Sequence, residues 1–148
     1  MFENPQSCVL LADRHHGLTE GIRGLLETAF GTVVMVADKA SLLEGAVRLQ
    51  PDLAVVDLSL ARGSGLDWLR ELRRRCPTLK VIVLSVHDEQ SVRSAAIEAG
   101  ADAFVLKRAI ATDLVPAVDA VRRGQGTEKT SDEGRPTLTE TPSPPSRR

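Results

Sequence analysis

Aromatic side chains are scarce in this sequence, which has three phenylalanines, one tryptophan and no tyrosine among its 148 residues. Proteins that bind single-stranded nucleic acids stack the bases on aromatic side chains, so this composition argues against such a surface. A basic excess is missing as well, because 19 Lys and Arg face 20 Asp and Glu, for a net charge of −1. Since nucleic-acid-binding domains are usually basic, the sequence predicts a protein that does not bind nucleic acids directly.

Signals for secretion, membrane insertion and cysteine chemistry are missing too. The first residues contain no basic region followed by an apolar stretch, so no signal peptide is visible. No apolar run approaches the ~18 residues of a membrane span. The two cysteines, Cys8 and Cys76, form no CxxC motif, and Cys8 lies in an apolar run, where we interpret it as a core residue. We therefore expect a cytoplasmic protein without membrane contact.

Short apolar runs alternate with amphipathic segments along most of the chain. Apolar runs bounded by turn residues are typical of strands buried on both faces, and apolar residues about three or four apart are typical of helices. A strand followed by a helix, repeated five times, predicts an α/β fold with parallel strands, right-handed crossovers and helices on both faces. The expected strands are residues 8–12, 33–36, 53–57, 81–84 and 104–106, and the expected helices are residues 18–29, 41–49, 66–75, 91–99 and 112–123.

Two of the expected helices carry features that we interpret as surface or cap features. Thr112 is expected to act as the N-cap of the last helix. Trp68 and the run Arg73-Arg74-Arg75 are interpreted as a solvated helix end, where the helix dipole favours cations. A partner-binding patch is the alternative for this segment.

The composition changes after Gly124. Residues 124–148 contain no aromatic residue, one large aliphatic residue (Leu138) and half of the eight prolines. Such a segment cannot bury enough surface to offset its chain entropy. We therefore expect one folded domain over residues 1–124 and a disordered tail rich in Pro, Ser and Thr over residues 125–148.

Polar residues follow four of the expected apolar runs. Asp13, Asp57, Ser85 and Lys107 each stand directly after such a run. An ionised carboxylate at the end of a buried strand needs a group that uses or neutralises its charge. In open parallel sheets, ligands gather beyond the carboxyl ends of the strands. Two carboxylates, a hydroxyl and an ammonium group converging there predict a site for a phosphoryl group, with or without a metal ion.

Four segments together resemble the receiver domain of two-component response regulators. They are LADRH (residues 11–15), PDLAVVDL (51–58), VLS (83–85) and GADAFVLK (100–107), in the family's order. The subgroup resembled most is the LuxR-type regulators, whose receiver domain usually precedes a helix-turn-helix DNA-binding domain. The resemblance spans residues 8–124. It implies a flavodoxin-like fold, a doubly wound five-stranded parallel sheet of order 2-1-3-4-5 with helices on both faces.

The resemblance also implies roles for the residues at the strand ends. Asp57 stands at the position of the phosphoacceptor, which attacks the phosphohistidine of a partner kinase and becomes an aspartyl phosphate. Lys107 stands where the family binds a phosphoryl oxygen. The family's Mg²⁺ site corresponds here to the carboxylates of Asp13 and Asp57 and the backbone carbonyl of Ser59.

Ser85 and Phe104 occupy the positions of the family's conformational switch. By the resemblance, the Ser85 hydroxyl donates to the phosphoryl group, and the ring of Phe104 swings inward when that hydroxyl moves. Each residue has a simpler alternative. Ser85 is a common capping residue for a following turn, and Phe104 is equally compatible with a plain core position.

Three positions depart from the family's pattern. Arg14 replaces the second residue of an acidic pair, so a cation stands where a carboxylate usually binds the metal. The electrostatic attraction between this side chain and the metal ion, of several kcal/mol, thus becomes a repulsion. Its guanidinium could instead pair with Asp13 or Asp57 and substitute for the metal's charge. Ala61 stands where the family often has proline, and Arg108 where an acidic residue or proline is common.

We therefore expect a stand-alone receiver in phosphorelay signalling that is phosphorylated on Asp57 and acts through protein contacts. Its expected partners are a sensor histidine kinase or phosphotransfer protein, and another regulator or a second copy of itself. The alternative is an atypical receiver with impaired Mg²⁺ binding that serves as a phosphorylation-independent interaction or dimerisation module. An enzyme is not expected, because aspartate-based phosphatases of the haloacid dehalogenase type need a second acid where this chain has Ser59.

Overall fold

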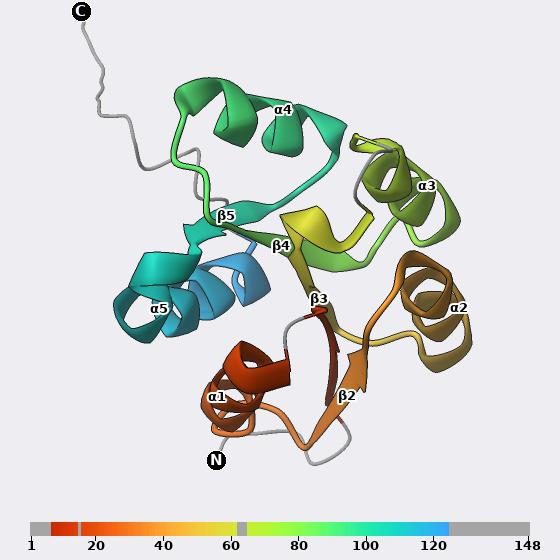
Figure 1. Cartoon of the computed structure of the whole chain (residues 1–148). Helices are drawn as coiled ribbons and strands as arrows, with labels where there is room; N and C mark the ends of the chain where they lie inside the picture. The colour runs from red at the N-terminus through yellow and green to blue at the C-terminus, as the bar shows by residue number, and fades with distance from the viewer. Residues whose placement is uncertain (1–6, 15, 62–64, 125–148) are drawn as a thin grey trace, which may run out of the picture.

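The computed structural model describes residues 7–14, 16–61 and 65–124, and the predicted tail lies outside this part. Within it, strands and α-helices alternate (Figure 1). None of these helices is long and apolar enough to cross a lipid bilayer. The strands are β1 (Cys8–Ala12), β2 (Thr32–Val36), β3 (Leu53–Asp57), β4 (Lys80–Ser85) and β5 (Ala103–Leu106). The helices are α1 (His16–Leu26), α2 (Lys39–Leu49), α3 (Asp67–Arg75), α4 (Gln90–Ala99) and α5 (Ile110–Arg122), with 3₁₀ helices η1 (Leu58–Ala61) and η2 (Lys107–Ala109).

The strands form one sheet of order β2-β1-β3-β4-β5 in which every neighbouring pair is parallel. This confirms the expected doubly wound α/β fold and its strand order. β3 lies in the middle, and all five of its residues are buried. Because the strands run in the same direction, their carboxyl ends meet at one end of the sheet.

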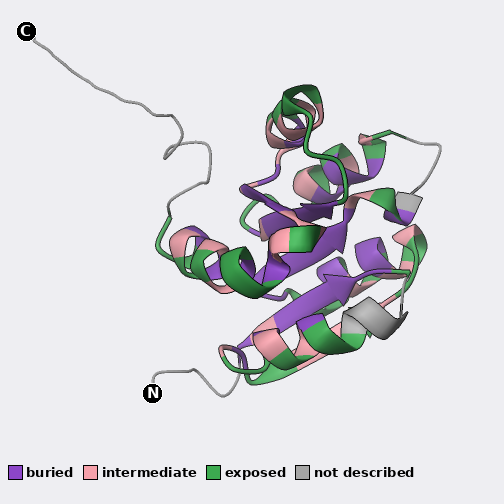
Figure 2. Cartoon of the chain, turned by 60° about the vertical axis from the view of Figure 1, so that its left-hand side comes forward, coloured by how far each residue is buried: buried purple, intermediate pink, exposed green. Residues whose placement is uncertain are grey.

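Helices cover both faces of the sheet (Figures 1 and 2), and each face carries its own hydrophobic core. Successive residues of a strand point to opposite faces. Leu10 therefore belongs to the core covered by α2, α3 and α4, which we call the α2–α4 core, whereas Val9 and Leu11 belong to the core covered by α1 and α5. Burying one large aliphatic side chain contributes about 1.5–3 kcal/mol, so the two cores together hold the helices against the sheet.

Several helix boundaries differ from the prediction by one to three residues, and two of these differences have a clear physical cause. α1 ends at Leu26, and the next residues form a turn in which the N–H groups of Ala29 and Phe30 both bond to the Leu26 carbonyl at 3.0 Å. α5 begins at Ile110, so Thr112 lies inside its first turn and is not the N-cap. Apolar spacing indicates the buried face of a helix, but the hydrogen bonds at its ends decide where it begins and ends.

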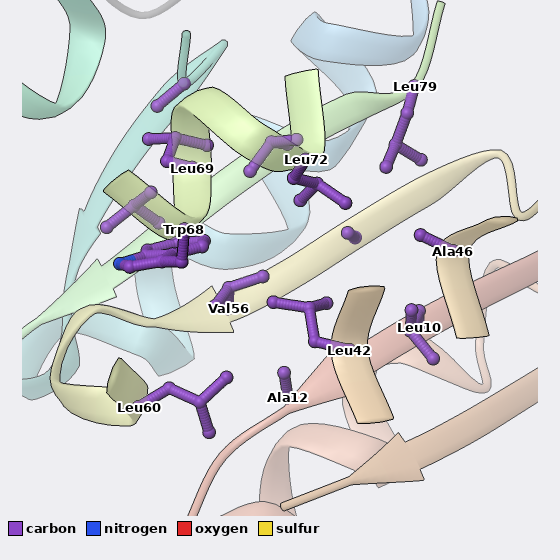
Figure 3. Close-up of a cluster of buried hydrophobic side chains, with 14 of the residues drawn as sticks. Leu10, Ala12, Leu42, Ala46, Val56, Leu60, Trp68, Leu69, Leu72 and Leu79 are labelled. Carbon is purple, nitrogen blue, oxygen red and sulfur yellow. The ribbon is translucent and has the colours of Figure 1, made fainter. Parts of the chain in front are cut away.

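Trp68 is fully buried, and the prediction that it marks a solvated helix end is wrong. It packs with Leu69 and Leu72 on the inner face of α3, in the α2–α4 core (Figure 3). Positions 68 and 72 are four residues apart and so share one helix face. The indole ring therefore anchors α3 to the sheet rather than facing a partner.

The three arginines at the end of α3 are not equivalent. Arg73 points inward, and its Nη2 donates to the Gly100 carbonyl at 2.7 Å and to Oδ2 of Asp102 at 2.6 Å. Only Arg74 and Arg75 have the exposed side chains that were predicted for all three, at 70% and 46%. Arg73 thus connects α3 to the turn between α4 and β5.

Candidate functional site

The predicted polar residues meet at the carboxyl end of the sheet. Asp57 and Ser85 are the last residues of β3 and β4, while Asp13 directly follows β1 and Lys107 directly follows β5. The strand register sets these ends level with one another, through the pairs Ala12–Val56, Asp57–Leu84 and Ser85–Leu106. Four segments far apart in sequence therefore supply one site.

Lys107 joins the two aspartates. Its Nζ lies 2.9 Å from Oδ2 of Asp57 and 3.8 Å from Oδ2 of Asp13. The Lys107 side chain is 10% exposed, and those of Asp57 and Asp13 are 3% and 0% exposed. Carboxylates shielded from water need a countercharge, and the ammonium group provides it for both. These three residues form one buried charged cluster.

Ser59 binds the Asp57 carboxylate through its backbone and its side chain. Its N–H donates to Oδ1 at 3.1 Å, and its hydroxyl donates to Oδ2 at 2.9 Å. Ser59 lies in η1, which begins directly after β3 and turns these donors back toward the strand end. The family resemblance predicted a role only for the Ser59 carbonyl, as a metal ligand. Aspartate side chains commonly accept a hydrogen bond from the backbone N–H two residues later and so form a local turn. The spacing of Asp57 and Ser59 is the signal that could have revealed this contact.

The charge on Asp57 is stabilised by these donors. Burial raises the pKa of Asp57, but the hydrogen bonds from Lys107 and Ser59 lower it, and the balance leaves the pKa below its ordinary value. The carboxylate is therefore ionised at neutral pH. That is the protonation state in which an aspartate can attack phosphorus.

The hydroxyl of Ser85 faces the loop that follows β4. It accepts a hydrogen bond from the His87 N–H at 2.9 Å and donates to the His87 carbonyl at 3.2 Å. Ser85 is buried, and within the described residues its hydroxyl makes no hydrogen bond to Asp57. In this conformation Ser85 caps the following turn, as the simpler alternative predicted.

Phe104 already faces the interior. The residue is 3% exposed and belongs to the α2–α4 core. Arg93 of α4 lies over its ring, with the guanidinium carbon 5.1 Å from the ring centre. A cation within about 6 Å of a ring centre is attracted to the face of the ring. Arg93 could not be predicted from the sequence, because no spacing pattern relates a helix residue to the strand residue that it covers.

Two arginines depart from the family's pattern, and both are exposed. In the described part of the chain, no hydrogen bond or ion pair joins Arg14 to Asp13 or Asp57, so the structure does not show its guanidinium substituting for a metal's charge. Arg108 pairs with Asp88 at 2.9 Å, and this hydrogen bond lowers the pKa of Asp88. The pair connects the loop after β4 to the turn after β5.

The donors available to a divalent cation form a small set. Among the described residues, no group of three or more His, Cys, Asp and Glu side chains is arranged to hold a metal. Mg²⁺, however, is usually bound by one or two carboxylates, with waters and phosphate oxygens as its other ligands. Asp13 and Asp57 approach the same ammonium group and meet that minimum, with the Ser59 carbonyl as the third predicted ligand.

The doubly wound sheet and the buried Asp57–Lys107 pair at its carboxyl end are those of a signalling receiver. The family model of the response regulator receiver domain matches residues 9–119. The chain belongs to this family.

Named relatives support the LuxR-type subgroup. The nitrate/nitrite response regulator protein NarP of Escherichia coli K12 is 38% identical over 118 residues, which cover 78% of this chain and 55% of NarP. A LuxR-family response regulator from Aurantimonas sp. SI85-9A1 has a TM-score of 0.75 at 27% identity, over 81% of this chain and 87% of that one. The non-phosphorylated receiver domain of RcsB from Escherichia coli has a TM-score of 0.73 at 27% identity, over 81% of this chain and 95% of that one. The chain thus spans about half the length of NarP and matches its receiver region.

Membership in the family places the chain in two-component signalling. Receiver domains interact with histidine kinases or phosphotransfer proteins and generally use Mg²⁺ for their phosphorylation. They typically act as signalling modules rather than as enzymes.

Proposed function

We propose that this chain accepts a phosphoryl group on Asp57 from a sensor histidine kinase or a phosphotransfer protein. It then signals in the cytoplasm by contacting another regulator or a second copy of itself. The observation that carries this proposal is the buried carboxylate of Asp57 held 2.9 Å from the ammonium group of Lys107. In this proposal residues 1–124 are the receiver domain and residues 125–148 are a separate segment.

The proposed transfer requires positioning and charge compensation more than covalent help from the protein. An Asp57 oxygen attacks the phosphorus of the donor's phosphohistidine, the new O–P bond forms as the P–N bond breaks, and the electron pair leaves with the imidazole. Lys107 neutralises Asp57 beforehand and compensates the charge of the phosphoryl oxygens afterwards. Ser85 must exchange its bonds to His87 for one to the phosphoryl group.

Asp13, Asp57 and the carbonyl of Ser59 are the groups that would hold Mg²⁺. When bound, Mg²⁺ neutralises charge on the phosphoryl group during its transfer. Arg14 places a positive charge next to Asp13 in the sequence, where the family has a carboxylate. We expect this substitution to weaken Mg²⁺ binding, because like charges repel.

A phosphorylation-independent binding or dimerisation module is the second candidate function. Arg14 is the observation that favours it, since a chain with a weak metal site would be phosphorylated poorly. In this candidate the fold and its surface are retained while Asp57 stays unmodified.

Intact-mass spectrometry after incubation with acetyl phosphate and Mg²⁺ distinguishes the two candidates. Phosphoryl transfer predicts one added phosphoryl group on the natural chain and none on an Asp57→Asn variant. We expect Arg14→Asp to lower the Mg²⁺ concentration for half-maximal labelling by at least about tenfold, which corresponds to ~1.4 kcal/mol. Label on Arg14→Asp alone would support the second candidate. Absence of label on both proteins would contradict the proposal that Asp57 is a phosphoacceptor.

A further inference from the structure

Arg93 covers Phe104 at the surface of the α2–α4 core. The guanidinium carbon lies 5.1 Å from the ring centre, Phe104 is 3% exposed, and Arg93 itself is half-buried on α4. A guanidinium group over an aromatic face is attracted to the ring, and the attraction grows when the pair is shielded from water. The ring is thus enclosed by apolar side chains of the core and covered by Arg93.

The buried position of the ring does not depend on the Ser85 hydroxyl. In the switch implied by the resemblance, the ring turns inward once that hydroxyl has moved to the phosphoryl group. Here the hydroxyl still bonds to the backbone of His87, and yet Phe104 is already buried. Since the two events are separate in this chain, contacts other than the Ser85 hydroxyl hold the ring: the apolar side chains of the core and, over the face of the ring, Arg93.

We propose that Arg93 is a positioning residue that keeps the Phe104 ring buried whether or not Asp57 carries a phosphoryl group. The regulatory role of this contact rests on the proposed function, because Phe104 can act as a switch residue only if Asp57 is phosphorylated. With Arg93 in place, the surface formed by α4 and β5 has the same ring position in both states of Asp57. A partner that recognises this surface through the ring position would then bind both states.

The size of the effect follows from the contact. Loss of a cation–π contact changes the ratio of exposed to buried ring by about 2- to 30-fold. Without Arg93, burial of the ring would depend more on the Ser85 hydroxyl, and therefore on phosphorylation. An Arg93→Gln variant should therefore show a Phe104 ring position that depends on phosphorylation of Asp57, which the natural chain lacks.

The other core provides a matched control. Arg122 lies over the ring of Phe30, with its guanidinium carbon 4.7 Å from the ring centre, and Phe30 is also 3% exposed. Phe30 belongs to the core covered by α1 and α5, on the opposite face of the sheet, and Arg122 lies exposed above it, with Nη1 donating to the Ala29 carbonyl at 3.3 Å. Arg122→Gln thus makes the same chemical change at a ring that has no proposed role in signalling.

Fluorine NMR of the full chain labelled with 4-fluorophenylalanine measures both rings. The Phe104 and Phe30 signals are assigned with Phe104→Leu and Phe30→Leu variants. The shift between H₂O and D₂O reports how far each ring is exposed. Spectra of the natural chain, Arg93→Gln, Arg93→Lys and Arg122→Gln are recorded before and after treatment with acetyl phosphate and Mg²⁺, with the added phosphoryl mass measured in parallel.

In the natural chain, we expect a shielded Phe104 signal that does not change on phosphorylation. Arg93→Gln should raise the exposed population about 2- to 30-fold, and phosphorylation should lower it again. The exposed population of the Phe104 ring in Arg93→Lys should lie between those of the natural chain and Arg93→Gln. If Arg93→Gln does not fold, Arg93→Lys is compared with the natural chain instead. Arg122→Gln should change only the Phe30 signal.

Two results would overturn the proposal. One is a Phe104 ring that stays as shielded in Arg93→Gln as in the natural chain. The other is a natural chain whose ring is exposed before phosphorylation and shielded after it. If no phosphoryl mass is added to any protein, the proposed function fails, while the comparison of the unmodified natural chain with Arg93→Gln still decides the role of Arg93.

Discussion

Replacing Lys107 by methionine tests the electrostatic account of the site most directly. The change keeps a long apolar side chain but removes the only ammonium group that contacts Asp57 at 2.9 Å and Asp13 at 3.8 Å within the described part of the chain. The two buried carboxylates then lie close together without that countercharge. At neutral pH and without divalent cations, we expect a large loss of folding stability.

The expected loss is about 3–4 kcal/mol at pH 7. Leaving one partner of a buried ion pair uncompensated costs about 3–5 kcal/mol. The folded protein can limit that cost by protonating one carboxylate. Taking a group of ordinary pKa near 3.9 to its neutral form at pH 7 costs about 4 kcal/mol, at 1.36 kcal/mol per pH unit. The two estimates agree.

The substitution should also reverse the pH dependence that Asp57 contributes. In the natural chain the pKa of Asp57 is lowered, so its contribution to stability is present above the unfolded pKa of about 3.9 and is lost as the pH falls through the folded value. In Lys107→Met the pKa of Asp57 should rise above the unfolded value, because burial raises it and the hydrogen bond from Lys107 no longer lowers it. The variant should then become more stable between pH 7 and pH 5, by at most about 1.4 kcal/mol per pH unit.

Urea unfolding in EDTA at pH 7 and pH 5, followed by circular dichroism, measures both effects. Arg108→Met is the matched control, because it removes the adjacent cation, whose ion pair with Asp88 is exposed at 66% and 54%. Such exposed pairs contribute little, so the control should show no measurable loss. A loss below about 1 kcal/mol in Lys107→Met, with the pH dependence of the natural chain, would refute the reasoning.

Two further substitutions test contacts beside and behind the site. Ser59→Ala removes the hydroxyl that donates to Oδ2 of Asp57, so the pKa of Asp57 should rise. When the rate of labelling by acetyl phosphate is plotted against pH, the acidic limb of the curve should therefore move to higher pH. An unchanged limb would show that this hydroxyl does not help to stabilise the charge. Arg73→Ala removes the bonds to Gly100 and Asp102 and should cost about 1.5–3 kcal/mol in urea unfolding. Arg74→Ala, at a 70% exposed side chain, should cost nothing measurable, and equal losses for both variants would contradict the inward role of Arg73.

The site could be located from the sequence because its residues occupy strand ends. Asp57 and Lys107 each follow an apolar run, and parallel strands bring such positions together without any knowledge of side-chain contacts. The alternation of strands and helices also indicated the fold class. The strand order, in contrast, came from the family resemblance, since alternation alone is compatible with several orders.

The remaining features depend on contacts that no local pattern encodes. Trp68 was interpreted, together with the three arginines, as part of a solvated helix end, but its packing with Leu72 outweighs the polarity of its neighbours. The contact of Arg93 with Phe104 joins a helix to a strand and depends on the angle at which α4 crosses the sheet. Tertiary packing decides such positions, whatever the local propensity.

The burial of Trp68 gives the two cores different optical properties. The chain has a single tryptophan, and it lies in the α2–α4 core, whereas Phe30 is the only aromatic residue that the described part of the chain contributes to the core covered by α1 and α5. Intrinsic fluorescence therefore reports the loosening of one face of the sheet, while circular dichroism reports the helices of both. The two signals will follow the same unfolding curve only if both faces come apart in one cooperative step.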